Sequence, residues 1–183
     1  MVKKPVRLER LHSKEMKFDH PVCIISSPIA DREFFVVEQK TRRIYRLTKG
    51  SGDFSTDRKE LFVDLSDEAS TGQFEGVLCL AFHPDFKKNR KYYVNYHVRN
   101  QGSHFSPIIA ERTVTADFKK DAGGKSRRLL QIPQATDLHW GGMLAFGPDG
   151  YLYIGAGDAG PQEDPDGNGQ KLSVLTGSIL RID

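Results

Sequence analysis

Residues 137–160 read DLHWGGMLAFGPDGYLYIGAGDAG and contain two short apolar runs that are separated by a turn sequence. The first run, 143–146, is followed by Gly-Pro-Asp-Gly, and the second run, 151–154, is rich in aromatic and branched side chains. In this turn proline fixes φ, aspartate bonds its own backbone and glycine accepts a positive φ. The stretch therefore predicts a β-hairpin in which 144–146 pairs antiparallel with 152–154.

A histidine stands at the start of this hairpin. His139 precedes Trp140, Gly141 and Gly142, and glycines beside an ionisable side chain allow another backbone or a ligand to come close. One interpretation is a structural histidine whose ring bonds a backbone carbonyl. The other is a general base, because imidazole titrates near neutral pH. The histidine and its two glycines alone leave both interpretations open.

The same stretch contains a glycine pattern that resembles a nucleotide-binding motif. Gly155, Gly157 and Gly160 follow a strand with the spacing G-x-G-x-x-G. A dinucleotide fold requires a helix that begins at these glycines. Residues 161–169, PQEDPDGNG, instead contain two prolines and two further glycines. We therefore reject a nicotinamide cofactor.

The composition is typical of a turn-rich β protein. The 183 residues are 38% hydrophobic and include 17 glycines and 9 prolines. The net charge of +3, from 27 basic and 24 acidic residues, is too small and too dispersed to indicate nucleic acid as a partner. No apolar segment is long enough for a membrane span or a signal peptide. Cys23 and Cys79 both lie in apolar runs, so buried thiols and a disulfide both remain open.

Strand–turn–strand units recur along the chain. The sequence LAFHPD at 80–85 returns as LAFGPD at 144–149, and the turn prolines Pro28 and Pro84 are separated by a similar interval. Such a repeat predicts an all-β fold, a β-propeller with one four-stranded blade per unit. We expect an N-terminal arm at 1–19 and an incomplete propeller domain at 20–183. Its blades should span about 20–66, 76–133 and 139–183, and the last blade lacks a clear fourth strand.

The complete motif from His139 to Asp158 is H-x-G-G-x-L-x-F-G-P-D-G-x-L-Y-x-G-x-G-D, and the chain continues to GSILRID at 177–183. It resembles the glucose/sorbosone dehydrogenase family, which includes soluble quinoprotein glucose dehydrogenases and aldose sugar dehydrogenases. VVEQ at 36–39 is similar to the first blade of that family, and EGVLCLAFHPDF at 75–86 to its second. The resemblance extends from about Phe18 to Asp183. It implies a six-bladed propeller, of which this chain would form about the first three blades.

The resemblance also implies a chemistry. In the quinoprotein members, pyrroloquinoline quinone (PQQ) lies over the propeller axis. His139 would take the proton from the C1 hydroxyl of a sugar or aldose while a hydride passes to the quinone, and a further electron acceptor would then reoxidise the cofactor. Calcium is a further cofactor that the full-length protein could hold.

The resemblance implies a periplasmic or extracellular protein, yet the chain has no export signal. We therefore expect that the start codon was assigned too late or that the gene is truncated.

The sequence departs from the enzyme pattern at two positions. Leu138 stands where the glucose dehydrogenases have an aspartate, and Phe74 stands where they have a glutamine that binds at the site. Gln73, one position away, is the candidate cofactor-binding residue. The cationic residues that hold the quinone carboxylates belong to later blades, so we expect this chain alone to be inactive. A non-catalytic binding or scaffold propeller, like the hedgehog-interacting proteins, is the alternative function.

A possible metal site lies after the hairpin. Asp164, Asp166 and Asn168, followed by Gly169, resemble the beginning of a calcium loop, with oxygen ligands at alternate positions. The glutamate that such a loop requires would fall on Leu175. A solvated loop and weak calcium binding both remain open.

Overall fold

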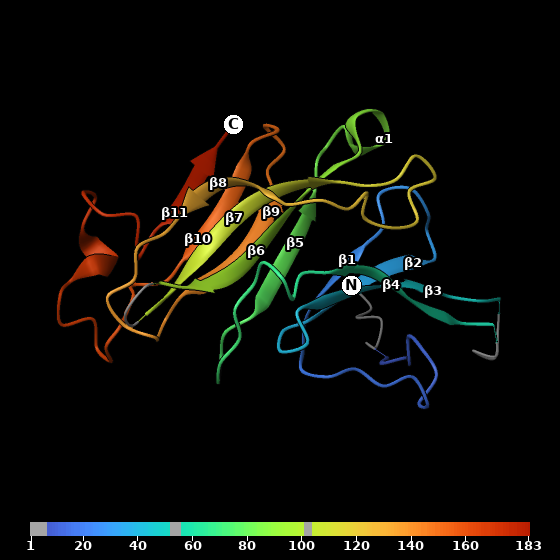
Figure 1. Ribbon diagram of the computed structural model, residues 1–183, viewed down its shortest axis with the longest axis horizontal. Helices are drawn as coiled ribbons and strands as arrows, with labels where there is room; N and C mark the ends of the chain where they lie inside the picture. Colours follow the sequence, from blue (N-terminus) through green and yellow to red (C-terminus); the bar gives the residue numbers. More distant parts are fainter. Residues whose placement is uncertain (1–6, 52–55, 101–103) are drawn as a thin grey trace, which may run out of the picture.

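The computed structural model describes residues 7–51, 56–100 and 104–183, and this part of the chain is almost entirely β-structure (Figure 1). Its strands form three separate sheets, each joined by antiparallel pairing of neighbouring strands. The first six residues of the expected arm lie outside the described residues. The all-β prediction is confirmed.

The first sheet, called blade 1 here, is a four-stranded meander in the order β1-β2-β3-β4. Every strand pairs antiparallel with the next one along the chain. The strands are β1 (Pro21–Ser26), β2 (Glu33–Glu38), β3 (Arg43–Thr48) and β4 (Arg58–Asp64).

The second sheet, blade 2, repeats this order with β5-β6-β7-β8. A single helical turn, α1 (Phe86–Asn89), follows the His-Pro-Asp sequence and ends at Arg90, whose positive φ of 59° reverses the chain into the next strand. The strands are β5 (Val77–Phe82), β6 (Lys91–Arg99), β7 (Phe105–Thr113) and β8 (Arg127–Gln131).

The third sheet, blade 3, has the order β11-β10-β9. Strand β9 (Gly141–Phe146) pairs antiparallel with β10 (Leu152–Ala156), and Leu144 lies opposite Ile154. The hairpin prediction is therefore confirmed. Strand β11 (Ile179–Ile182) completes the described sheet after a long loop that contains only one short 3-10 turn, η1 (Asn168–Gln170). No α-helix follows the glycine pattern in this described segment, in keeping with the rejection of a dinucleotide fold.

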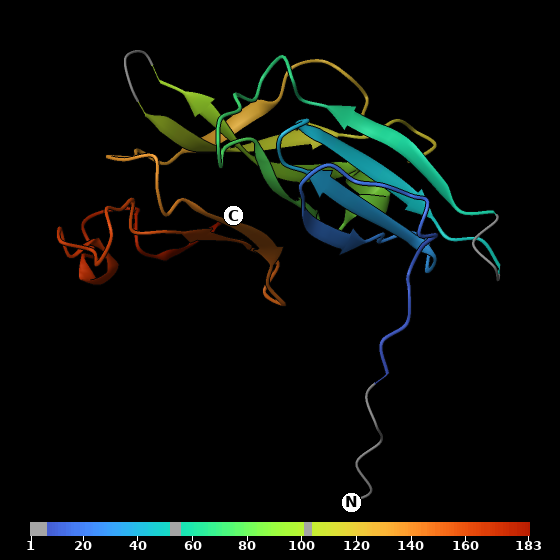
Figure 2. The same cartoon turned by 90° about the horizontal axis from the view of Figure 1, so that it is seen from below.

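The three blades stand in sequence order and pack face to face (Figure 2). Strand β6 shows how alternation produces this packing. Tyr92, Val94 and Tyr96 enter the core between blades 1 and 2, whereas Tyr93 enters the core between blades 2 and 3. Because successive side chains of a strand point to opposite faces, one sheet can join two hydrophobic cores.

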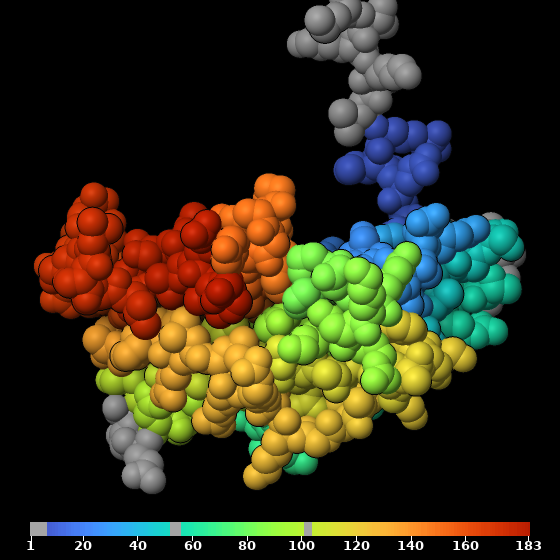
Figure 3. Space-filling view, turned by 90° about the horizontal axis from the view of Figure 1, so that it is seen from above, coloured from blue at the N-terminus to red at the C-terminus, as the bar shows by residue number. Residues whose placement is uncertain are grey.

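The first strands of the blades lie next to one another, since β5 contacts both β1 and β9. These strands therefore form the inner side of the arrangement. The space-filling view shows blade 2 (green to yellow) between blade 1 (blue to teal) and blade 3 (orange to red) (Figure 3). Ahead of β1, the carbonyl of Lys17 accepts a hydrogen bond from the ammonium of Lys59 in blade 1 at 2.7 Å. The chain thus contains consecutive blades of a β-propeller, as the repeat predicted. No helix among the described residues is long and apolar enough to cross a membrane.

Candidate functional site

The site is built at the start of blade 3, where His139 leads into β9. Its backbone has a φ of 52°, and Gly141 and Gly142 have φ values of 75° and 127°. A Cβ atom on Gly141 would meet the carbonyl oxygen of Gly155, and one on Gly157 would meet the carbonyl oxygen of His139. These glycines are therefore needed because two backbone segments cross closely beside the histidine.

The imidazole of His139 is held by a carboxylate. Its Nδ1 atom lies 2.8 Å from Oδ1 of Asp158, and the two side chains are 33% and 21% exposed. The backbone N–H of Gly160 donates to the same oxygen at 2.9 Å. This N–H, together with the hydrogen bond from His139, lowers the pKa of Asp158 although partial burial opposes ionisation.

In the hydrogen bond between His139 and Asp158, the histidine is the donor. An ionised carboxylate only accepts hydrogen bonds, so Nδ1 of His139 carries the proton that Asp158 accepts. The other ring nitrogen, Nε2, is then unprotonated in the neutral imidazole and able to accept a proton.

A β-bulge helps to place the carboxylate. The register between β9 and β10 shifts between Ile154 and Ala156, immediately before Gly157 and Asp158. Bulges bend a strand and change the direction of the side chains that follow. The loop that follows also holds this segment, because the amide of Asn168 donates to the carbonyl of Asp158 at 2.8 Å.

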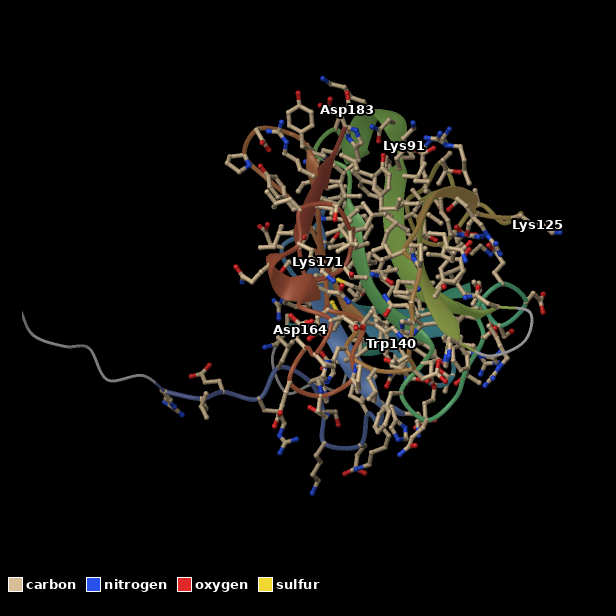
Figure 4. All side chains as sticks on the ribbon, turned by 90° about the vertical axis from the view of Figure 1, so that its left-hand side faces the viewer. Lys91, Lys125, Trp140, Asp164, Lys171 and Asp183 are labelled. Atoms are coloured by element: carbon tan, nitrogen blue, oxygen red, sulfur yellow. The ribbon has the colours of Figure 1, made fainter. Side chains whose placement is uncertain are left out.

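Two of the three predicted metal ligands, Asp164 and Asn168, form hydrogen bonds within this loop or to its start. The carboxylate of Asp164 accepts the backbone N–H groups of Asn168 at 2.7 Å and Gly169 at 2.9 Å, which orders η1. Within the described residues no group of three His, Cys, Asp or Glu side chains is arranged to hold a metal ion. Figure 4 shows Asp164 and Trp140 at the end of the blades opposite Asp183.

Gln73 is exposed in the loop before β5, and the hydrogen bonds of the described residues do not join it to His139. Its neighbour Phe74, which is 53% exposed, accepts a hydrogen bond from the Gln39 amide through its carbonyl. Among the described residues, a hydrogen bond thus joins His139 to Asp158, and none is found from Gln73 to either of them. A cofactor contact by Gln73 stays a prediction.

A buried histidine connects the start of blade 2 to the site. His97 on β6 is fully buried, accepts the backbone N–H of Gly76 at 3.2 Å and packs against Trp140 with ring centroids 4.7 Å apart. Burial lowers the pKa of His97 to about 4, although the charge of Asp137 opposes the shift. A neutral His97 therefore holds Gly76 and the residue after His139 together.

An open groove of about 440 Å³ lies next to the pair formed by His139 and Asp158. Its lining is mostly backbone and small side chains, with the exposed side chains of Met143 and Ile179 at 59% and 77%. No Lys or Arg belongs to the described lining. The groove can therefore receive a flat or small molecule, but it provides no cation for an anionic one.

Sequence reasoning missed Asp158. The residue was part of the motif, but its distance of nineteen positions from His139 gave no reason to pair the two. The signal that could have found it is the hairpin itself, because antiparallel pairing brings the residue after the second strand back to the residue before the first.

The fold and the site define a class: consecutive propeller blades with a histidine–aspartate pair at the start of the third described blade. Residues 18–183 match the family described as Glucose / Sorbosone dehydrogenase. The chain belongs to this family.

Two relatives of this chain carry the names of different classes of protein, one a hedgehog-interacting protein and the other a dehydrogenase. The hedgehog-interacting protein of Mus musculus is 32% identical over 173 residues, which are 89% of this chain and 24% of that protein. Quinoprotein glucose dehydrogenase B of Acinetobacter calcoaceticus is 30% identical over 196 residues, covering 93% of this chain and 40% of that enzyme. The chain therefore spans less than half the length of either relative.

Solved structures share the fold. The PQQ-bound aldose sugar dehydrogenase of Streptomyces coelicolor has a TM-score of 0.69 at 23% identity, with 96% of this chain and 47% of that chain covered. A putative oxidoreductase (glucose dehydrogenase) of Thermus thermophilus has a TM-score of 0.72 at 26% identity, with the same coverage.

Proposed function

We propose that the full-length protein oxidises the C1 hydroxyl of a sugar or aldose and that His139 is its general base. The observation that carries this proposal is the 2.8 Å contact between Nδ1 of His139 and Oδ1 of Asp158. Because Asp158 holds the proton on Nδ1, the Nε2 atom can take the hydroxyl proton as the C–H bond breaks. Asp158 then stabilises the imidazolium that forms.

The redox part of the reaction needs a hydride acceptor. PQQ would supply this chemistry when bound, as the quinoprotein and PQQ-bound relatives suggest. The groove beside His139 is lined by Gly141, Gly142, Gly155, Gly157 and Gly177, which leave room for a flat ring. The described lining of this groove has no cation for the three carboxylates of PQQ, so these lining residues do not by themselves fit the cofactor. We infer that cationic residues outside this chain complete the site and that the chain alone is inactive.

The test compares two histidines in the full-length protein. His139→Ala should lower sugar-dependent reduction of an artificial electron acceptor by roughly 10²- to 10⁴-fold, the usual effect of losing a general base. The matched control is His83→Ala, because the His83 ring accepts the backbone N–H of Asp85 in a turn and has no role in the proposed reaction. Turnover is measured per cofactor-loaded molecule, and a thermal melt is recorded for each variant.

A purely structural His139 would behave in the opposite way. Its loss would lower the melting temperature and leave the turnover of the folded protein almost unchanged. That result would remove His139 from the catalytic role.

A non-catalytic binding propeller is the second candidate function. It is favoured by the similarity to hedgehog-interacting protein and by the exposed Phe74 at a position where the enzymes use glutamine. An exposed aromatic side chain is typical of protein–protein contacts. The test is to load the wild-type full-length protein with PQQ and to measure its turnover with a series of aldoses. The absence of turnover with all of them would support this candidate over the enzyme.

A further inference from the structure

Three sulfur atoms from three different blades meet on the inner side of the structure. Sγ of Cys23 on β1 lies 3.5 Å from Sγ of Cys79 on β5, and Sγ of Cys79 lies 3.8 Å from Sδ of Met143 on β9. Both cysteines are free thiols. Sulfur atoms are drawn in yellow in Figure 4.

The repeat explains why these residues meet. Cys23 and Cys79 are 56 positions apart, the interval that also separates the turn prolines Pro28 and Pro84. Cys79 and Met143 are 64 positions apart, the interval between the two LAF sequences. The three residues therefore occupy the same place on the first strand of successive blades. Because these strands adjoin one another, equivalent side chains converge.

We propose that Cys23 and Cys79 are a peroxide-responsive thiol pair, whose oxidation forms a reversible disulfide between the first strands of blades 1 and 2. A disulfide requires the sulfur atoms to approach to about 2.05 Å. The sulfur atoms are already 3.5 Å apart, so only a gap of about 1.5 Å has to close for the bond to form.

The first step is attack by one sulfur on the peroxide. The thiol of Cys79 loses its proton to solvent, and the resulting thiolate attacks an oxygen of hydrogen peroxide. The O–O bond breaks, Cys79 becomes a sulfenic acid, and the leaving hydroxide takes up a proton from solvent and departs as water. The thiol of Cys23 then attacks this sulfur, the S–O bond breaks and a second water leaves. The two sulfur atoms together lose two electrons, and these reduce one peroxide to two waters.

The environment distinguishes the two thiols. The hydrogen bond from Cys23 lowers the pKa of Cys79 to about 7, and the same interaction raises the pKa of Cys23. Cys79 is therefore the nucleophile and Cys23 the thiol that resolves the sulfenic acid. Because Cys79 is only 1% exposed, a small oxidant such as a peroxide reaches it more readily than a bulky disulfide does.

The disulfide would have a measurable effect on stability. It would close a loop of the chain that contains β2, β3, β4 and the connection from β4 to β5. Cross-linking a loop of this length restricts the unfolded chain, and we expect the melting temperature to rise by roughly 10 °C.

The experiment uses the full-length protein that contains these 183 residues. Reduced protein is treated with hydrogen peroxide, its remaining thiols are alkylated, and its peptides are analysed by mass spectrometry without reduction. We expect one intramolecular peptide pair joined through Cys23 and Cys79, which a dithiol reductant separates. The oxidised protein should melt at a higher temperature than the reduced protein, and the two melting curves should coincide for Cys23→Ser.

Two further variants test the roles of the sulfur atoms. Cys23→Ser should accumulate a sulfenic acid on Cys79 that a dimedone probe labels, whereas Cys79→Ser should give much less labelling of Cys23. Met143→Leu should form the disulfide as the wild type does, which separates thiol oxidation from methionine oxidation. The proposal is overturned if both thiols of the folded wild type can still be alkylated after the peroxide treatment. It is also overturned if the disulfide forms only between molecules, or if Met143 sulfoxide is the sole product.

Discussion

Nδ1 of His139 lies 2.8 Å from a carboxylate oxygen of Asp158, and the two residues flank the hairpin formed by β9 and β10. The first carries the ring that can accept a proton, and the second fixes the orientation and tautomer of that ring. The hairpin thus brings together two residues that are far apart along the chain.

Replacing the carboxylate tests this relationship. In the full-length protein we expect Asp158→Asn to lower the rate of sugar oxidation about tenfold or more, because an amide no longer stabilises the imidazolium. Melting temperature and KM should change little. Asp149→Asn is the matched control, since Asp149 also accepts hydrogen bonds in this hairpin, from the Tyr153 hydroxyl at 2.7 Å. Equal rates for both variants would argue against a positioning role for Asp158.

The close backbone crossing beside His139 predicts a strong effect of a single methyl group. Gly141→Ala should destabilise the chain by about 3 kcal/mol or more, because its Cβ would meet the Gly155 carbonyl in addition to the strain of a positive φ. Gly123→Ala is the control: its φ of 85° is similar, but no atom lies within 4 Å of the added Cβ. That substitution should cost about 1 kcal/mol. Urea unfolding of both variants measures the difference, and similar losses would contradict a steric origin.

A buried ion network joins the segment between blades 1 and 2 to blade 2. The guanidinium of Arg112, 5% exposed, binds Asp121 at 2.7 Å and Glu68 at 2.7 Å. Arg112→Met would leave both carboxylates without this cation and should cost roughly 3 to 5 kcal/mol. Arg127→Met removes an exposed partner of Glu111 and should cost much less stability than Arg112→Met. Chemical denaturation of the two variants gives the comparison, and a small loss for Arg112→Met would show that the network adds little.

His97 predicts how stability depends on pH. Burial lowers the pKa of His97 from 6.5 to about 4 in the folded chain. Between pH 6.5 and about 4, His97 is therefore protonated in the unfolded chain and neutral in the folded chain. This contribution to stability is complete above pH 6.5, decreases as the pH falls and is lost below about 4. It amounts to at most about 3 kcal/mol.

A variant without the histidine checks this prediction. His97→Gln should make the free energy of unfolding less dependent on pH between 6.5 and 4. Unfolding by urea at a series of pH values gives these slopes, and identical slopes for wild type and His97→Gln would refute a titration of His97.

Local sequence was sufficient to predict much of the fold. Turn residues such as those at 147–150 and the alternation of apolar side chains depend only on neighbouring positions, so the hairpin of 144–146 with 152–154 could be derived from the sequence and is present in the structure. The repeat of LAF-x-P-D similarly indicated recurring blades, because each unit requires the same turn between its strands. His139 was identified because two glycines and an apolar strand follow it.

The partners of these residues were decided by the tertiary structure. Asp158 reaches His139 only because β10 pairs with β9 and carries a bulge next to Gly157, and Cys23 meets Cys79 only because the first strands of two blades adjoin. Such distances depend on strand register and on packing between sheets. A shift by one residue would turn each side chain to the opposite face of its sheet. The sequence therefore determined which strands and turns form, whereas the packing of complete blades determined which of their side chains can react with one another.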